Sequence, residues 1–139
     1  QSAKGVIKVF KADITHRREL EGALSEIKSM WGAPSVLINN AAIDSHPSAP
    51  VEENGPFETY PESCLDKVID VNLKGAVIAS QVFGGAMAEA GRGSIINISS
   101  IYGLLSPNQD IYDYRRKQGA DWYKPVGYSV TKSATRLAS

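Results

Sequence analysis

The sequence predicts an α/β fold built on a parallel, doubly wound sheet. Three runs rich in β-branched residues, at positions 6–13, 36–38 and 94–100, have the composition of strands. Helical patterns separate these runs. Strands that alternate with helices indicate βαβ units, which build a parallel sheet with helices on both faces. The 139 residues are enough for one domain or for part of one.

The first predicted strand, residues 6–13, leads into an amphipathic helix. Thr15 is placed to cap the start of this helix, because Thr is among the preferred N-cap residues. Gly32-Ala33-Pro34 should end the helix. Between these limits the apolar residues recur at helical spacing, at Leu20, Leu24, Ile27 and Trp31.

The second predicted strand, residues 36–38, is a continuous apolar run of the kind found in parallel strands that are covered on both faces. A long loop follows at residues 44–61, where four prolines interrupt the chain. Pro61 can open the next helix. The apolar stripe that begins at Leu65 is too long for one ordinary helix, so we expect a break or kink around residues 71–75.

The third predicted strand, residues 94–100, follows a turn at Gly91-Arg92-Gly93. Residues 103–127 form a polar and aromatic insertion, and helical periodicity returns at Tyr128. We therefore expect a single partial domain over residues 1–139.

Composition excludes several classes of function. Fifteen basic and fifteen acidic residues cancel, so no net field attracts nucleic acid or an anionic membrane. The single cysteine, Cys64, cannot form an internal disulfide or a cysteine-based metal site, which fits a reducing cytoplasm. His16 and His46 lack the spacing of metal ligands. Neither a membrane-spanning run nor a signal-peptide pattern is present in the sequence.

Tyr128 and Lys132 lie four residues apart, on one face of the last predicted helix. A free phenol ionises near pH ~10, too high for efficient proton transfer at neutral pH. An ammonium group one turn away stabilises the phenolate, because opposite charges attract. The pair can therefore pass a proton to or from a substrate hydroxyl. A solvated helix face with a packed tyrosine is the alternative for the isolated pair.

Polar residues follow each predicted strand where a ligand would bind. Ligands of open α/β sheets bind beyond the carboxyl ends of the strands. Asp13 stands at the first such end, Asn39-Asn40 at the second and Ser99-Ser100 at the third. Hydrogen bonds to nearby backbone and turn capping are the structural alternatives for these residues. Their common position nevertheless predicts one shared site.

Together these motifs resemble a short-chain dehydrogenase/reductase of the classical type, a family with a Rossmann-like doubly wound sheet. The matching segments come in the family's order, from about residue 6 to the end of the sequence. They are Asp13-Ile14, Leu37-Ile38-Asn39-Asn40-Ala41-Ala42, Asp70-Val71-Asn72-Leu73-Lys74-Gly75, Gly93-Ser94-Ile95-Ile96-Asn97-Ile98-Ser99-Ser100 and Tyr128-x-x-x-Lys132.

The resemblance implies an oxidoreductase that moves a hydride between NAD or NADP and an alcohol or ketone. Tyr128 would be the acid and base, and Ser100 would orient the substrate oxygen. Lys132 would bind the nicotinamide ribose, and Asn72 would hold a water that extends the proton relay through Lys132. No metal is needed. A homodimer or homotetramer is implied, packed through the long helices.

The resemblance also implies a second group of residues that contact the cofactor. Asp13 and Ile14 would contact the adenine, while Asn40, with Ala41 beside it, would contact the adjacent ribose region. Tyr128 and Lys132 complete the cofactor contacts.

The chain departs from the family pattern at both ends. The Gly-rich phosphate-binding turn belongs upstream of Val6, and further strands and helices belong after Lys132. We therefore expect a domain truncated at both ends that binds the cofactor poorly alone. The segment that would discriminate NAD from NADP also precedes residue 6.

The insertion at residues 103–127 separates Ser100 from Tyr128 more widely than is usual in the family. A solvated surface loop is one interpretation. The other is a wall of the substrate pocket, where aromatic residues would stack on a ring and Arg115 or Arg116 would bind an anionic group. Similar insertions in members associated with glycan modification imply a sugar-like substrate.

Two other functions compete with the dehydrogenase hypothesis. A sugar-nucleotide epimerase or dehydratase shares the Tyr/Lys pair on a similar fold. A non-catalytic, cofactor-binding relative is the third hypothesis. The presence of Asn72, Ser100, Tyr128 and Lys132 together favours the enzyme.

Overall fold

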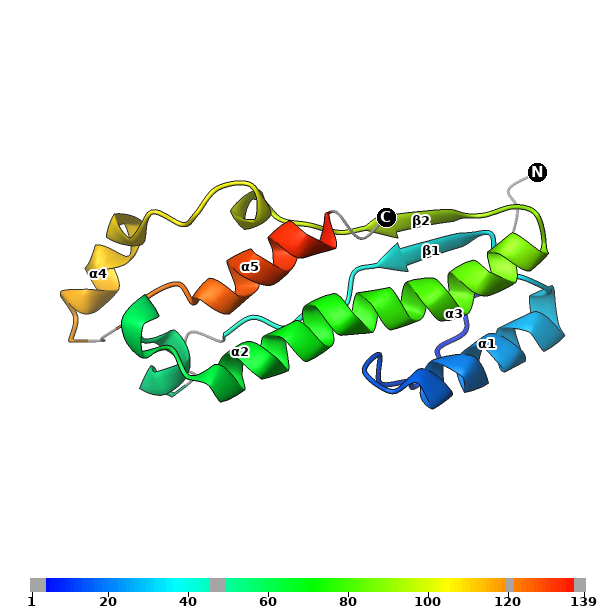
Figure 1. Ribbon diagram of the computed structural model, residues 1–139, viewed down its shortest axis with the longest axis horizontal. Coiled ribbons are helices and arrows are strands. Elements are labelled where there is room, and N and C mark those ends of the chain that lie inside the picture. The colour runs from blue at the N-terminus through cyan, green and yellow to red at the C-terminus, as the bar shows by residue number, and fades with distance from the viewer. Residues whose placement is uncertain (1–4, 46–49, 120–121, 137–139) are drawn as a thin grey trace.

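The structure consists of two parallel strands, a long helical segment across them and shorter helices at one end (Figure 1). This computed structural model describes residues 5–45, 50–119 and 122–136. Strands β1 (Val36–Asn39) and β2 (Ser94–Asn97) pair in register, with Val36 opposite Ser94 and Asn39 opposite Asn97. The predicted parallel α/β architecture is confirmed.

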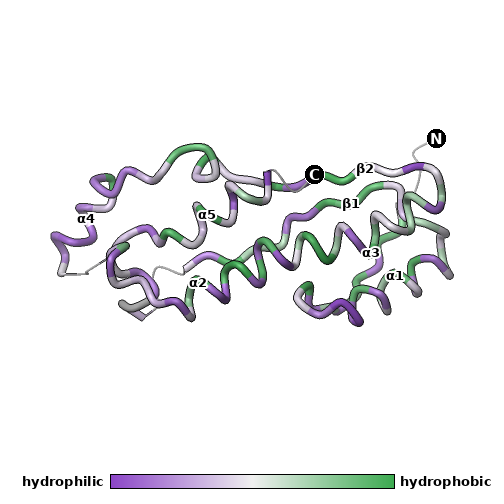
Figure 2. Tube along the Cα trace, viewed as in Figure 1, coloured by the Kyte–Doolittle hydropathy of each residue, from purple (hydrophilic) through white to green (hydrophobic). Residues whose placement is uncertain are grey.

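Helix α1 (Arg17–Trp31) and helix α3 (Ala76–Glu89) pack against one another, and α3 also contacts both strands. Figure 2 shows that β1 and much of α3 are hydrophobic, whereas the segment around α4 (Asp113–Arg116) is hydrophilic. The buried core is formed by Leu20, Ala79 and Val82, with Ile14, Leu37, Phe83 and other apolar side chains packed around them. Leu20 and Leu24 of the predicted helical stripe therefore lie in or against the core, whereas Trp31 of the same stripe is 53% exposed.

In the described part of the chain, helices do not cover the second face of the strand pair. Val36 is 53% exposed, Ile38 57% and Ile96 44%, although these side chains are as apolar as those on the covered face. A doubly wound sheet buries both faces of its strands. These exposed residues are the surface on which that fold would place a second helical layer.

The strand predicted over residues 6–13 is wrong. The described residues of this segment form no strand, and Val6, Ile7 and Val9 are 77%, 92% and 85% exposed. Strand propensity reflects packing and pairing with a neighbouring strand, and none lies beside this segment. Its end is nevertheless anchored, because Ala12 and Ile14 pack against the core.

The start of α1 also differs from the prediction. His16, not Thr15, is the N-cap. Thr15 instead donates both its backbone N–H and its hydroxyl to Asp13 Oδ1, at 2.8 Å each. The end of the helix was predicted correctly, since Gly32 caps it with φ +82°, a conformation that favours glycine.

The expected break in the long helical stripe is confirmed. Helix α2 (Glu62–Ile69) passes into one turn of π-helix at Asp70–Gly75 before α3 begins. A methyl group on Gly75 would lie 2.7 Å from Ile14 Cδ1, so the absence of a side chain lets Ile14 pack there. Single π-turns of this kind are frequent at functional sites.

Two 3-10 turns, Val51–Asn54 and Phe57–Thr59, lie in the predicted loop before α2. The insertion contains the 3-10 turns Ile101–Gly103 and Gln109–Tyr112 and helix α4. Helix α5 (Val126–Thr135) follows and packs against the π-turn and α2. This arrangement brings α5 to the carboxyl ends of both strands (Figure 1).

Candidate active site

Helix α5 carries Tyr128 and Lys132 one turn apart. Pro125, with φ −63°, is the N-cap of this helix. Lys132 is 5% exposed, and its Nζ donates to the carbonyl oxygen of Ile98 at 2.7 Å and lies 5.8 Å from the centroid of the Tyr128 ring. Burial lowers the pKa of Lys132 from its ordinary value of 10.5. An ammonium group has three donors, so Lys132 can bridge the end of β2 and a ligand.

The segment that follows β2 is fastened to α5 at Lys132. Ser99 Oγ donates to the Lys132 carbonyl oxygen at 2.7 Å, and Ser133 Oγ donates to the Gly103 carbonyl oxygen at 2.9 Å. A methyl group at Gly103 would lie 2.7 Å from that Lys132 oxygen, so the backbone approaches α5 as closely as glycine permits. The segment 99–103 is therefore in direct contact with the helix of Tyr128.

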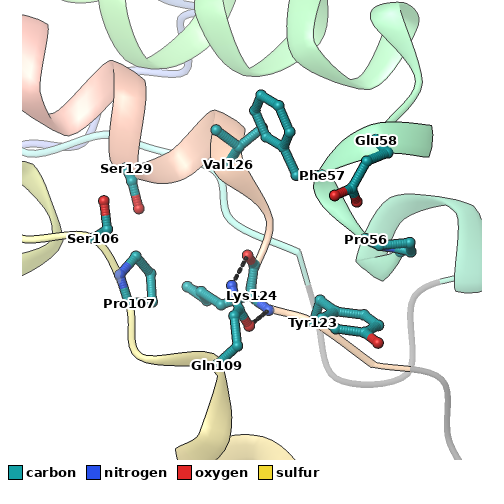
Figure 3. Close-up of a pocket in the computed structure, with 11 residues that line it drawn as sticks. Pro56, Phe57, Glu58, Ser106, Pro107, Gln109, Tyr123, Lys124, Val126 and Ser129 are labelled. Atoms are coloured by element: carbon teal, nitrogen blue, oxygen red, sulfur yellow. Dashed lines mark hydrogen bonds between the residues drawn. The ribbon is translucent and has the colours of Figure 1, made fainter.

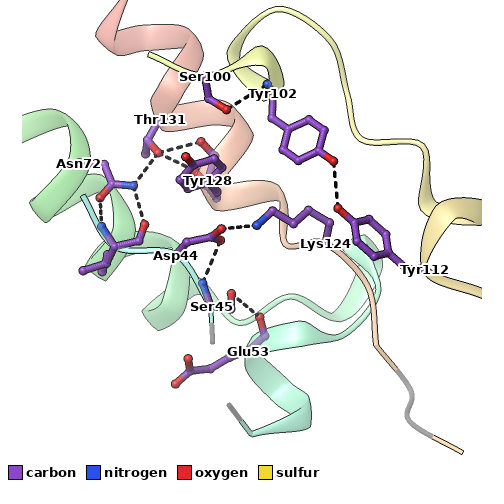
Figure 4. A network of polar contacts seen from close by, with 12 residues as sticks. Asp44, Ser45, Glu53, Asn72, Ser100, Tyr102, Tyr112, Lys124, Tyr128 and Thr131 are labelled. Atoms are coloured by element: carbon purple, nitrogen blue, oxygen red, sulfur yellow. Dashed lines mark hydrogen bonds and ion pairs between the residues drawn. The ribbon is translucent and has the colours of Figure 1, made fainter. Parts of the chain in front are cut away.

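Ser100 lies in this fastened segment, in the same region as Tyr128 (Figure 4). Its Oγ accepts a hydrogen bond from the Tyr102 backbone N–H at 3.2 Å and caps the turn that follows. A hydroxyl that accepts in this way keeps its own proton to donate. The structure thus brings Ser100, Tyr128 and Lys132 together, and capping and substrate binding are compatible for Ser100.

Asn72, in the π-turn, links the loop after β1 to α5. It is 2% exposed, and its side chain accepts from Ile43 N at 2.7 Å and donates to Ile43 O at 2.9 Å. It also donates to Thr131 Oγ1 at 3.1 Å. Sequence reasoning missed Thr131, which is fully buried on α5 one turn after Gly127 and whose hydroxyl donates to the Gly127 carbonyl oxygen. The water-holding role of Asn72 stays a prediction.

The residues predicted to contact the adenine side of the cofactor gather around a second hollow, next to the end of β1. Ile14, Asn40 and Ala41 line one cavity of about 130 Å³, together with Gly75. Asp13 is the neighbour of Ile14, and the hydrogen bond from the Thr15 backbone lowers the pKa of Asp13 below 3.8. Of the four residues predicted to contact the adenine and its ribose, Ile14, Asn40 and Ala41 thus line one cavity, and Asp13 does not. Their contact with a cofactor stays a prediction.

The insertion folds on itself through stacked aromatic and guanidinium groups. The ring centroids of Tyr112 and Trp122 lie 4.5 Å apart, and Arg115 Cζ lies 4.7 Å from the centroid of the Trp122 ring. Arg116 binds Asp113, the carbonyl oxygens of Gln109 and Trp122 and the Tyr123 ring. The proposal that Arg116 grips a substrate anion is therefore wrong, because its guanidinium holds the insertion together.

The insertion does reach the reaction centre, through a residue that sequence reasoning did not single out. Lys124 forms an ion pair with Asp44 of the loop after β1. Its Nζ lies 4.8 Å from the centroid of the Tyr128 ring and 6.0 Å from that of Tyr102. The Tyr102 and Tyr112 hydroxyls are 3.0 Å apart, and burial with this hydrogen bond raises the pKa of Tyr112 to about 12.

A cavity of about 330 Å³ lies between the insertion, helix α5 and the 3-10 turn Phe57–Thr59 (Figure 3). Phe57, Pro107, Tyr123 and Val126 give it an apolar lining, and Ser129 reaches it from α5. Neither Tyr128 nor Ser100 lines it. This cavity is therefore beside the candidate reaction centre and does not contain it.

Metal binding and membrane insertion find no support in the described residues. Among residues 5–45, 50–119 and 122–136, no cluster of three His, Cys, Asp or Glu side chains could hold a metal ion. His16 contacts Asp13, and His46 lies outside the described residues. In the part of the chain with a described structure, the helices are too short or too polar to cross a bilayer.

Comparison with known proteins identifies the family of this chain. A family model described as short chain dehydrogenase matches residues 1–114. The chain is 31% identical over 102 residues to an NAD-dependent glycerol dehydrogenase of Listeria innocua, which covers 73% of this chain and 37% of that protein. It is 37% identical over 92 residues to a 3-alpha-(or 20-beta)-hydroxysteroid dehydrogenase of Mycobacterium tuberculosis, covering 66% and 32%. The chain thus spans about a third of the length of these relatives.

Solved structures show the same fold. A gluconate 5-dehydrogenase from Burkholderia cenocepacia, crystallised with NADP and tartrate, is similar with a TM-score of 0.68 at 24% identity. The similarity covers 90% of this chain and 40% of that one. It identifies the described elements as part of a Rossmann-fold sheet. Because the family model matches residues 1–114 of the 139 in this chain, the chain belongs to the short chain dehydrogenase family.

Proposed function

We propose that this chain carries the proton-transfer site of an NAD(P)-dependent oxidoreductase that acts on an alcohol or ketone. The supporting observation is that the segment 99–103 is fastened to α5 at Lys132, which brings Ser100 beside Tyr128 and Lys132. A phenol, an ammonium group and a hydroxyl are the groups that such a reaction requires.

In this proposal each residue has one role. Tyr128 gives a proton to the substrate oxygen during reduction and takes it back during oxidation. Ser100 donates a hydrogen bond to the same oxygen, because its Oγ proton is not used when it accepts from Tyr102. Lys132 stabilises the phenolate and holds a ribose hydroxyl with its remaining donors.

The chemistry of the hydride belongs to the nicotinamide cofactor, which supplies or accepts it when bound. The residues present fit such a group. Lys132 is buried and keeps donors at the strand ends, and Ile14, Asn40 and Ala41 line a hollow of about 130 Å³ farther along the same edge. We propose that Asp13, Ile14, Asn40 and Ala41 bind the adenine side of the cofactor. Turnover measured in parallel with NAD⁺ and with NADP⁺ distinguishes the two cofactors.

The substrate is proposed to be a sugar-like or other hydroxylated compound. The insertion supports this proposal, because its Lys124 places an ammonium group beside the Tyr128 ring, and its Tyr112 adds a hydroxyl that is hydrogen-bonded to Tyr102. The similarity to a glycerol dehydrogenase also favours a polyol, whereas that to a hydroxysteroid dehydrogenase favours a larger apolar alcohol.

We further propose a cytoplasmic homodimer or homotetramer that packs through α2 and α3. The single cysteine supports a reducing compartment, because it leaves the sequence without an internal disulfide. Light scattering of the full-length protein should give a mass of two or four chains, and a monomer at micromolar concentration would contradict the assembly.

One assay separates the dehydrogenase from its competitors. The full-length protein is incubated with NAD⁺ or NADP⁺ and with a panel of sugars, nucleotide sugars, polyols and secondary alcohols. Net formation of reduced nicotinamide, followed by absorbance, is the expected result. Conversion of a nucleotide sugar without net reduction would indicate the epimerase or dehydratase instead. Cofactor binding without any turnover would indicate the non-catalytic relative.

A further inference from the structure

The ion pair between Asp44 and Lys124 lies beside the ring of Tyr128 and joins two loops (Figure 4). Asp44 belongs to the loop after β1, and Lys124 belongs to the insertion. The Lys124 side chain is 11% exposed and that of Asp44 is 34% exposed. Lys124 Nζ is 4.8 Å from the centroid of the Tyr128 ring. Two opposite charges, a mostly buried ammonium and a carboxylate that stays open to water, therefore border the proposed reaction centre.

The backbone is fixed at Lys124 itself and at the residue before Asp44. The Asn72 amide bonds the N–H and the carbonyl of Ile43, the residue before Asp44, at 2.7 and 2.9 Å. In the same way the Gln109 amide accepts from Lys124 N at 3.0 Å and donates to Lys124 O at 3.1 Å. Two hydrogen bonds from one amide hold a peptide in position and orientation. The charges are thus pre-organised before a substrate arrives.

The pair offers hydrogen-bond donors and acceptors side by side. An ammonium group has three donors, and Lys124 directs one at Asp44 Oδ2. An ionised carboxylate has about four acceptor sites, of which Asp44 uses one on Oδ1 for the Ser45 N–H. Lys124 can therefore donate to a further partner, and Asp44 can accept from one. A single hydroxyl matches both groups, because its oxygen can accept from the ammonium while its proton is donated to the carboxylate.

Other substrates match this surface less well. An apolar group on the carbon next to the reacting one would displace water from the two charges and form no hydrogen bonds to them. This loss of hydrogen bonds is unfavourable. A substrate carboxylate at this position would be attracted by Lys124 but repelled by Asp44, so it gains little net attraction from the pair. The mixed charge therefore favours a neutral polyol over an apolar alcohol and over a hydroxy acid.

We propose that Asp44 and Lys124 are specificity-determining residues that select substrates with a hydroxyl on the carbon next to the reacting one. This inference rests on the proposed function, since it takes Tyr128 as the reaction centre. It assigns a substrate-binding role to the insertion at a residue other than its two arginines.

The test compares two secondary alcohols that differ in one neighbouring hydroxyl, 2,3-butanediol and 2-butanol. The full-length protein is assayed with its cofactor, and the readout is the ratio of the two kcat/KM values. The fraction of active enzyme cancels in this ratio. The ratio therefore still measures the preference between the two substrates when a variant is partly unfolded. A hydrogen bond to a charged group predicts a ratio of about 10 to 100 in favour of the diol in the wild type.

Lys124→Met keeps the length of the side chain and removes its donors, so the ratio should fall about tenfold, or to near one where the wild-type ratio is itself about 10. The double variant Asp44→Leu, Lys124→Met removes both charges and should bring the ratio close to one. Lys117→Met is the matched control, because Lys117 is an exposed lysine of the same insertion, and its ratio should stay at the wild-type value.

The outcomes separate the inference from the function on which it rests. A wild-type ratio near one, or a ratio that both variants leave within twofold, overturns the selection by Asp44 and Lys124 and leaves the oxidoreductase standing. Failure of the wild type to oxidise any alcohol with either cofactor overturns the proposed function and this inference with it.

Discussion

Replacing Gly103 by Ala tests how closely the segment 99–103 is pressed against α5. The added methyl group would lie 2.7 Å from the Lys132 carbonyl oxygen and 2.8 Å from Ser99 Oγ. Ordinary carbon–oxygen contacts are ~3.3–3.6 Å, so the segment must move away from α5 by roughly 0.6 Å or more. Gly103 is not among the described glycines with positive φ, so the cost is steric and not one of backbone conformation.

Two effects should follow from this displacement. Over-packing of a close contact costs about 1–3 kcal/mol, which denaturant unfolding of the full-length protein can measure. Ser100 moves with the segment, and a misplacement on the order of 1 Å can cost about 10²-fold in rate. We therefore expect kcat/KM to fall by about 10- to 100-fold while the cofactor remains bound.

Gly22→Ala is the matched control. Gly22 lies in the exposed face of α1, and a methyl group there would meet nothing within 4 Å. Alanine in a helix interior is favoured over glycine by about 0.5–1 kcal/mol, so stability should rise slightly and kcat/KM should not change. If Gly103→Ala behaves like this control in both measurements, the described contact between the segment and α5 does not exist.

Three further predictions concern stability. Asn72→Ala removes the side-chain partner of the Ile43 N–H and carbonyl and one of the partners of Thr131, so the free energy of unfolding in urea should fall by about 1–3 kcal/mol, and a change below about 0.5 kcal/mol would argue against these hydrogen bonds. Because the pKa of Asp13 is lowered when folded, its contribution is present above pH 3.8 and is lost as the pH falls through the lowered value. Asp13→Asn should flatten the acid side of the unfolding profile; an unchanged acid profile would refute this role. The pKa of Tyr112 is raised to about 12 when folded, so its contribution is present below pH ~10 and is lost between about pH 10 and 12. Tyr112→Phe should reduce the alkaline loss of stability, and equal slopes in both proteins would count against the buried hydroxyl pair.

The sequence contains the information for elements that depend on local pattern. The helical period from Leu20 to Trp31 locates α1, and the overlong stripe beyond Leu65 locates the π-turn. The spacing of Tyr128 and Lys132 places both on one helix, where the structure has them. These features are predictable because residues within a few positions of one another determine them.

Features that depend on distant partners could not be predicted in this way. Residues 6–13 have strand composition but form no strand, because strand formation requires a neighbour. The pairing of Asp44 with Lys124 joins positions 80 residues apart and depends on how the insertion folds. Arg115 or Arg116 was predicted to bind an anionic group of the substrate, whereas the described contacts of Arg116 are with the insertion itself.

The most direct test of the account is Tyr128→Phe in the full-length protein, which removes one oxygen atom and leaves the ring in place. Turnover should fall by about 10³-fold or more, because proton transfer contributes about 10²–10⁴-fold and Ser100 and Lys132 cannot replace the phenol. The dissociation constant of the reduced cofactor, measured by fluorescence, should stay within about threefold of the wild-type value, since one hydroxyl contributes little to it. A variant that keeps more than a tenth of wild-type turnover would contradict the assignment of Tyr128 as the proton donor.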